Sequence, residues 1–380
     1  MTPTPELETN LLGGVDIPSA EDLLAMRESN YILRARGGKL TRVEAEKHLL
    51  PHDPQANPQA IEAALSPEGI VYVRLASIMC RSADGGRTWD ACPLSDRIDS
   101  FQVLSDGTLV AAGVPDGVER GDCVIFVSSM DGGRTWRKIS EIAHRAGHTG
   151  GVYAIHRLPD DTLVCGISAS NVIMEEDKYV SGEADAHVYR SADGGATWEG
   201  PTGRICTWGS EGNIARTPSG RLLAIIRHQR PFLPLDPPDF IEEFRGRGAI
   251  GGPYKNVFLV DSTDDGRTWH NFRQLTTVFG QTRGHGAAFS DGTVVVVHDT
   301  RYGPGSPGSR GMISRDEGQT WEDEVYYLDR TSFTGSYNAT LAIEDDLLLT
   351  IGGWSDAGNG WDLVLDNTHF TAIRWRPVLH

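Results

Sequence analysis

The stretch SADGGRTW, from Ser82 to Trp89, occurs five times in this 380-residue chain with small changes. We call the shared pattern, Ser-x-Asp-x-Gly-x-Thr-Trp, the box. Its copies are Ser82–Trp89, Ser129–Trp136, Ser191–Trp198, Ser262–Trp269 and Ser314–Trp321. Self-similarity at intervals of tens of residues is typical of repeat architectures, in which each copy marks one supersecondary unit. The box therefore divides the chain into units long enough for a four-stranded sheet with its loops.

A second repeat, a hairpin signal between apolar runs, supports the same division. It occurs six times, as SPEGIVYV, LSDGTLVAA, LPDDTLVCG, TPSGRLLAII, FSDGTVVVV and IEDDLLLTI. Asp-Gly and similar pairs between β-rich runs are the strongest short-range hairpin signal. The sixth unit, from about Tyr337, keeps its hairpin and lacks a box. Six four-stranded antiparallel units predict an all-β, six-bladed β-propeller; two sandwich domains are the alternative, but they leave the recurring box unexplained.

The predicted domain organisation is one propeller, residues 57–380, preceded by an arm, residues 1–56, that packs on it. A short helix is expected around Leu40–Leu50. Closure of the ring requires a terminal strand, and both THFTAIRW near the C-terminus and NYILRAR near the N-terminus are candidates. Two insertions, Ala169–Ala186 and Gln229–Lys255, are expected to lie over one face, where long loops are often functional.

Composition excludes several classes of partner. The net charge of −17 repels nucleic acid and anionic lipid. No apolar run is long enough for a membrane span, and no secretory signal is visible, so a cytoplasmic location is expected. The five cysteines show no metal-ligand spacing and predict reduced thiols, with no metal and no cofactor. An acidic ligand would need a local cluster of arginines.

Each part of the box has a structural role. The Asp can accept hydrogen bonds from backbone N–H groups that follow it, the Gly supplies a positive φ, and the Trp packs into the sheet. Five symmetric copies argue against catalysis, because one active site needs one asymmetric set of residues.

These boxes resemble the Asp boxes of the sialidase (neuraminidase) superfamily of β-propellers, and the resemblance covers nearly all of residues 57–380. Fold alone does not determine function. In a propeller, the starts of the innermost strands and the ends of the second strands share one face, opposite the box. By this criterion the predicted substrate-binding residues include Trp208, His148, Arg283, His285 and Arg301.

Three elements match the sialidase pattern. Glu211 opens EGNIARTPSGRLLAIIR, with Arg227 at its end; Arg310 lies in SRGMISRDEGQTW; and Tyr337 opens YNATLAIEDDLL. The resemblance implies that Tyr337 attacks the anomeric carbon while Glu211 accepts its proton. It also implies that Arg227 and Arg310 bind a substrate carboxylate, which a planar guanidinium can do with two hydrogen bonds.

The first unit departs from the sialidase pattern. The stretch QANPQAIEAALSPEG contains Pro58 but lacks the expected Arg, and no Asp precedes Asp84 of the box in this unit. A leaving group normally needs a positioned proton donor. The candidate replacements for the arginine are Arg34, Arg36 and Arg74, and those for the acid are Asp53, Asp99, His148 and His285.

Three functions follow as hypotheses. The first is a sialidase-like exo-glycoside hydrolase that releases a terminal acidic sugar. The second is a polysaccharide lyase on the same scaffold, in which Tyr and His share the acid and base roles on a uronate; His148 and His285 motivate it. The third is a non-catalytic glycan-binding propeller, which the missing acid and arginine would fit. All three imply an acidic carbohydrate as the partner.

Overall fold

The computed structural model describes residues 17–52, 61–94, 97–114, 123–143, 148–175, 178–230, 234–239, 254–278, 280–300, 305–330, 337–354, 357–358, 365–366 and 369–379. Within these residues the chain is built almost wholly of β-strands. No helix in the described ranges has the length and apolar character to cross a membrane.

Four separate antiparallel sheets of four strands follow one another along the chain. The first holds β3 (Ile61–Leu65), β4 (Val71–Leu75), β5 (Ile78–Ser82) and β6 (Asp90–Pro93). The second holds β7 (Arg97–Val103), β8 (Leu109–Val114), β9 (Cys123–Ser129) and β10 (Arg137–Ala143). The third holds β11 (His148–Arg157), β12 (Leu163–Glu175), β13 (Lys178–Ser191) and β14 (Glu199–Thr207). The fourth holds β15 (Gly209–Arg216), β16 (Leu222–Gln229), β17 (Lys255–Ser262) and β18 (His270–Gln274).

A nine-stranded sheet contains the fifth and sixth repeat units and the N-terminal strands, in the order β19-β20-β21-β22-β1-β2-β27-β24-β23. Its fifth-unit strands are β19 (Gln281–Ala288), β20 (Val294–Thr300), β21 (Gly308–Ser314) and β22 (Glu324–Tyr327). The others are β1 (Tyr31–Arg36), β2 (Lys39–Leu49), β27 (His369–Trp375), β24 (Leu348–Trp354) and β23 (Ala339–Ala342). A small separate pair comprises β25 (Ala357–Gly358) and β26 (Leu365–Asp366).

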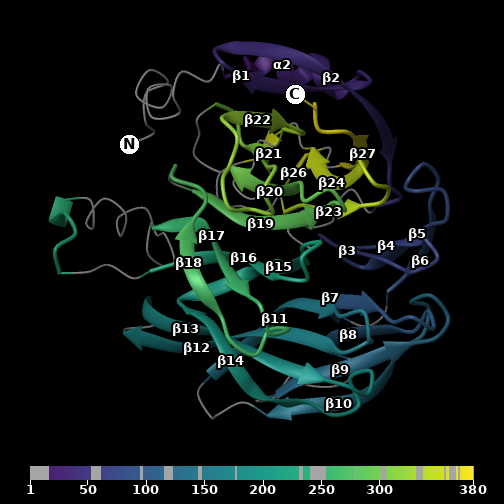
Figure 1. The fold of residues 1–380 in the computed structure, drawn as a ribbon, viewed down its shortest axis with the longest axis vertical. Helices are drawn as coiled ribbons and strands as arrows, with labels where there is room; N and C mark the ends of the chain where they lie inside the picture. Colours follow the sequence, from purple (N-terminus) through teal and green to yellow (C-terminus); the bar gives the residue numbers. More distant parts are fainter. Residues whose placement is uncertain are drawn as a thin grey trace.

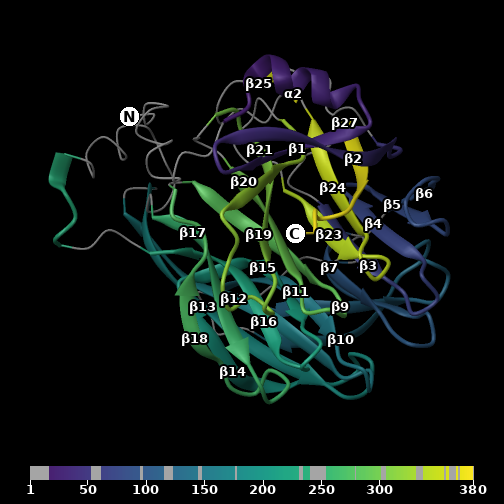
Figure 2. The same ribbon diagram turned by 45° about the horizontal axis from the view of Figure 1, so that its top comes forward.

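The innermost strands contact one another in a closed cycle, β3, β7, β11, β15, β19, β23 and back to β3. Figures 1 and 2 show the sheets following one another around this centre, with the purple N-terminal strands beside yellow β27. The predicted all-β, propeller-like arrangement is therefore confirmed. The structure shows four separate blades and one nine-stranded sheet where the sequence predicts six separate blades.

The N-terminal strands explain the nine-stranded sheet. β1 pairs with β22 on one side and with β2 on the other, and β2 pairs with β27. Both candidate closing segments are therefore used: THFTAIRW contains β27, which pairs with β24, and NYILRAR contains β1. Unpaired strand edges expose backbone donors and acceptors, and β1 and β2 cover two such edges at once.

The helix expected around Leu40–Leu50 is absent, because those residues form β2. Lys39–Glu44 pair with β1 and Ala45–Leu49 pair with β27, and this strand pairing along the whole length of β2 outweighs the helix propensity of Glu44-Ala45-Glu46-Lys47. Within the described residues 17–52, the chain forms one helix, α2 (Ala20–Arg27), which begins with a capping box. The Asp22 N–H donates to Ser19 Oγ at 3.1 Å, and the Ser19 N–H donates to Asp22 Oδ2 at 2.9 Å.

Apolar side chains fill the spaces between neighbouring sheets. β20 is buried at all seven positions of VVVVHDT, so its sequence lacks the alternation of a strand with one wet face. Between the second and third sheets, for example, Val110 and Phe126 pack with Leu163 and Cys165. Each such side chain contributes about 1.5–3 kcal/mol of hydrophobic stabilisation.

The box is a hydrogen-bonded turn that also joins adjacent sheets. In the second copy, Asp131 Oδ1 accepts from the Thr135 N–H at 2.9 Å, and Oδ2 accepts from Thr135 Oγ1 at 2.7 Å. Gly133 has φ +89°, and a Cβ there would lie 2.9 Å from Met79 Cγ of the first sheet. Trp136 packs on the core between these two sheets. The other four copies repeat the Asp-to-Thr hydrogen bonds.

The boxes predict a defined loss of stability in acid. Their hydrogen bonds lower the pKa of Asp131, Asp264 and Asp316 to about 2, from an ordinary value of 3.8. A carboxyl group with a lowered folded-state pKa contributes stability above its unfolded pKa and loses that contribution as the pH falls through the folded value. We therefore expect the wild-type melting temperature to fall between about pH 4 and pH 2.

The matched variant is Asp264→Asn, which removes one titrating group and keeps the side-chain shape. The variant should melt below the wild type near neutral pH, and the gap should narrow toward pH 2. Melting curves recorded across this range check the prediction; a constant gap at every pH contradicts it.

Candidate active site

Strand register places the candidate site at the end of the ring opposite the boxes. In the first sheet, Ile61 pairs with Leu75 and Leu75 pairs with Ile78 at one end, while Ser82, which opens the box, pairs with Val71 at the other. The remaining units follow the same antiparallel order. The starts of the inner strands and the ends of the second strands therefore meet at one end, which we call the site end.

Glu211 is directed by a distortion of its strand. The register of β15 and β16 shifts between Ser210 and Gly212, so Glu211 is the extra residue of a bulge, with φ +30°. A Cβ at Gly212 would lie 1.8 Å from the Ile225 carbonyl oxygen, so only glycine fits beside the bulge. Bulges commonly redirect a side chain next to active sites. A positive φ at a glutamate is a strained conformation that functional sites often retain.

Arg227 holds Glu211 in an ion pair. Its Nη1 lies 2.8 Å from Glu211 Oε2, and its Nε and Nη2 donate to Ser210 Oγ at 3.1 and 2.9 Å. The side chains of Arg227 and Glu211 are 17% and 30% exposed. Arg227 therefore fixes the position of the Glu211 carboxyl group at the site end.

Tyr337 lies against a second arginine. The Cζ atom of Arg283 is 4.3 Å from the centre of the Tyr337 ring. The Arg283 side chain is 5% exposed and forms an ion pair with Glu62 of the first sheet. Its Nη1 and Nη2 both donate to the Ile61 carbonyl oxygen at 3.4 Å. The start of β19, the start of β3 and the residue preceding β23 thus meet at the site end.

The first sheet supplies a charged group, Glu62, that sequence analysis did not assign. Glu62 is buried against Arg283, and burial raises its pKa; Arg283 and Arg74 oppose that rise, while Asp99 adds to it. Arg74 also donates from Nη2 to the Asp99 carbonyl oxygen at 3.0 Å. Of the three candidate replacements for the missing arginine, Arg74 is therefore the one in this cluster. Arg34 pairs with Glu324 and Arg36 with Glu322, where β1 meets β22.

The other predicted arginine, Arg310, is 3% exposed and is the third residue of β21, which begins at the site end, where Gly308 pairs with Thr300. Its Cζ is 4.9 Å from the centre of the Tyr327 ring, and Nη2 donates to the Ser306 carbonyl oxygen at 3.3 Å. Arg301 and Asp53 lie outside the described residues. His148 begins β11, and its side chain is not among those described.

His285 is a buried link between sheets. Its ring is 6% exposed, its Nδ1 accepts from the Thr340 N–H at 3.1 Å, and the Asn213 amide lies 3.3 Å from the same nitrogen. Burial, with a contribution from Arg283, lowers its pKa to about 3. The neutral imidazole therefore joins the fourth, fifth and sixth units, and the structure places it beneath the site end.

Trp208 has φ +57° and precedes β15 beside Glu211. Its ring centre is 6.0 Å from that of His228 at the end of β16. His228 in turn contacts Phe258 and Phe272, whose rings stack at 4.6 Å. The predicted tryptophan thus belongs to an aromatic cluster on the fourth sheet.

Glu62 is the residue that sequence analysis missed most clearly. A signal for it existed, because Glu62 is the second residue of β3 and so meets the same criterion, the start of an inner strand, that selects Arg283. The first unit thus has a glutamate, rather than the expected arginine, at the start of its inner strand.

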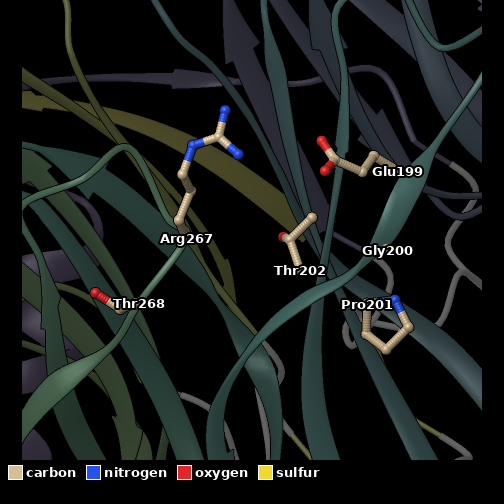
Figure 3. Close-up of a pocket in the computed structure, with 6 residues that line it drawn as sticks. All are labelled: Glu199, Gly200, Pro201, Thr202, Arg267 and Thr268. Atoms are coloured by element: carbon tan, nitrogen blue, oxygen red, sulfur yellow. The ribbon is translucent and has the colours of Figure 1, made fainter.

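A separate surface hollow of about 430 Å³ lies between the third and fourth sheets at the box end. Figure 3 shows its lining residues, Glu199, Gly200, Pro201, Thr202, Arg267 and Thr268. Arg267 and Thr268 belong to the fourth box, so the hollow lies at the opposite end from Glu211 and Tyr337. Its one acidic and one basic side chain do not form the cluster of charges that the site end has.

No protein-family model and no curated protein matches this chain. Several solved structures are similar to it in fold. A protein of unknown function from Dyadobacter fermentans DSM 18053 has a TM-score of 0.57 and 16% identity, covering 87% of this chain and 98% of its own. The Hadza microbial sialidase Hz136 has a TM-score of 0.53 and 15% identity, covering 83% of this chain and 65% of its own.

A third similar structure is a PL25 ulvan lyase, a polysaccharide lyase, with a TM-score of 0.52 and 11% identity, covering 89% of this chain and 86% of its own. This chain spans about two thirds of the length of the sialidase it resembles. At these identities the comparisons establish a shared propeller fold.

Proposed function

We propose that this chain is a sialidase-like exo-glycoside hydrolase that releases a terminal acidic sugar from a glycan. The observation that carries the proposal is the grouping of the Glu211–Arg227 ion pair and an arginine-backed Tyr337 among residues at the same end of the ring. The fold shared with sialidases supports it. We count the nine-stranded sheet as two blades joined by β1 and β2, so the propeller has six blades. We also assign the five box turns as Asp boxes.

In the proposed reaction, the Tyr337 oxygen bonds to the anomeric carbon as the glycosidic bond breaks. Glu211 takes the phenol proton as the general base. We assign proton donation to the leaving oxygen to Asp99, the third residue of β7, whose backbone carbonyl oxygen accepts a hydrogen bond from Arg74. Water then attacks the anomeric carbon and loses a proton to Asp99. The bond to Tyr337 breaks, and Glu211 returns its proton to the phenolate oxygen. Arg227 and Arg310 hold the substrate carboxylate.

A polysaccharide lyase is the second candidate, and the likeness to the ulvan lyase favours it. Here Tyr337 would remove the proton next to a uronate carboxylate, and Arg283 would stabilise the phenolate. His285 does not suit the role of acid or base in such a reaction, because it is buried and its pKa is lowered to about 3. A lyase would therefore need His148 or a second tyrosine.

Two assays separate these functions. The purified chain is incubated with a fluorogenic sialoside from mildly acidic to neutral pH, and separately with uronate polymers. We expect fluorophore release and no increase in the ultraviolet absorbance that marks an unsaturated uronate. An absorbance increase alone identifies a lyase, and saturable binding without turnover in either assay identifies a glycan-binding module.

The matched control is Arg267→Ala at the box-end hollow. It removes a cation far from the site end, so turnover should match the wild type. Loss of activity in this variant would indicate that the active site lies at the hollow, and it would contradict the proposal.

A further inference from the structure

Arg283 is held rigidly against the face of Tyr337. Its guanidinium is 5% exposed and has two fixed partners in the first sheet, the Glu62 carboxylate and the Ile61 carbonyl. The backbone that carries it is also tightly packed. A Cβ at the next residue, Gly284, would lie 2.5 Å from Ile225 and 2.9 Å from Val257 of the fourth sheet. Neither the strand nor the side chain has room to move.

The Glu62 side chain is also held in place by burial and by its ion pair. Its side chain is 12% exposed, and burying a carboxylate is costly unless it is paired. The partner is Arg283, and β23, the strand that follows Tyr337, contacts both β3 and β19, which carry the two side chains. Removing Arg283 alone would strand a buried carboxylate, so the two side chains behave as a unit.

We propose that Glu62 and Arg283 are positioning residues for Tyr337: Glu62 fixes the Arg283 guanidinium on the ring, and the guanidinium charge stabilises the phenolate of Tyr337. The catalytic consequence rests on the proposed function, while the electrostatic one does not. A cation at 4.3 Å from the ring centre interacts with an anion in the ring much more strongly than with the neutral phenol. The first sheet thus contributes to the site through Glu62, which acts by positioning Arg283.

This assignment changes the expected role of Arg283. The sequence predicts that Arg283 contacts substrate, and its loss would then mainly raise KM. If Arg283 is instead committed to Glu62 and Tyr337, its loss lowers kcat with KM nearly unchanged. Comparing the change in kcat with the change in KM therefore distinguishes a residue that positions Tyr337 from one that contacts substrate.

The direct test is the titration of Tyr337, which requires no turnover. The phenolate absorbance of each protein is recorded against pH, and the curve of its Tyr337→Phe counterpart is subtracted. The double variant Glu62→Gln/Arg283→Gln replaces the charged pair by a neutral one and so avoids a stranded carboxylate. We expect its Tyr337 midpoint to lie at higher pH than in the wild type.

Two single variants complete the experiment. Glu62→Gln keeps an acceptor for Arg283 and removes the opposing charge, so the midpoint should move to lower pH. Arg283→Lys keeps the charge and should stay closer to the wild type than the double variant does. Identical midpoints in the wild type and the double variant overturn the proposal, whether or not the chain cleaves a sialoside.

If turnover is found, the double variant should lose about tenfold or more in kcat, as expected for a change in the reactivity of a nucleophile. If no turnover is found but the midpoints shift as expected, the proposed function fails and the positioning role stands. If turnover is found and the midpoints do not shift, the proposed function stands and this inference fails.

Discussion

Replacing Tyr337 by Phe is expected to abolish turnover of an acidic glycoside while leaving the melting temperature nearly unchanged. The change removes one hydroxyl and keeps the ring on which Arg283 lies, so packing is preserved. Loss of a nucleophile removes the covalent step, and rates in such variants fall by about a thousandfold or more. Initial rates at saturating substrate, with melting curves for both proteins, measure the two effects.

The matched control for Tyr337→Phe is Tyr189→Phe. Tyr189 is a half-buried tyrosine of β13 whose ring packs on Gly200 near the box end. It loses the same hydroxyl far from the site end, so its activity should equal that of the wild type. Full activity in Tyr337→Phe would refute the nucleophile assignment and favour a different attacking group.

The second large effect is expected from Arg227→Leu. This substitution removes the guanidinium that holds Glu211 and, by proposal, one cation for the substrate carboxylate. Truncating one partner of a hydrogen-bonded charge pair in an interface costs about 2–5 kcal/mol, so kcat/KM should fall by about a hundredfold or more. KM should account for much of the loss, since carboxylate binding precedes chemistry.

Two companion variants sharpen this test. Arg227→Lys keeps the charge but loses the planar fork, and it should recover only part of the lost kcat/KM. Arg204→Leu removes an arginine that is 58% exposed and pairs with Asp185 on the third sheet, and it should be neutral. An unchanged KM in Arg227→Leu would show that this arginine orients Glu211 without touching substrate.

Much of the fold could be predicted from the sequence, because its signals are local. The box closes through hydrogen bonds between residues two to four positions apart, as between Asp131 and Thr135. Its Gly133 has the positive φ that the turn requires. Hairpin signals are equally local, so the strand order of each unit could be predicted from the amino-acid sequence.

The N-terminal segment could not be predicted in this way. Lys39–Leu49 contains good helix formers, yet it is a strand because its first half pairs with β1 and its second half with β27. Backbone donors and acceptors are the same at every residue except proline, so edge pairing leaves little trace in a sequence. The joining of the fifth and sixth units into one sheet follows from this pairing.

The candidate site likewise has features that the sequence determines and features that depend on tertiary structure. The sequence by itself determined the end of the ring on which Glu211, Arg227 and Tyr337 lie, because strand direction follows from the hairpins. Only the tertiary structure decided that Glu62 meets Arg283, a residue 221 positions away, and that Arg283 lies on the ring of Tyr337. Such a contact depends on how the sheets close around the centre, since no local hydrogen bond or spacing links its members.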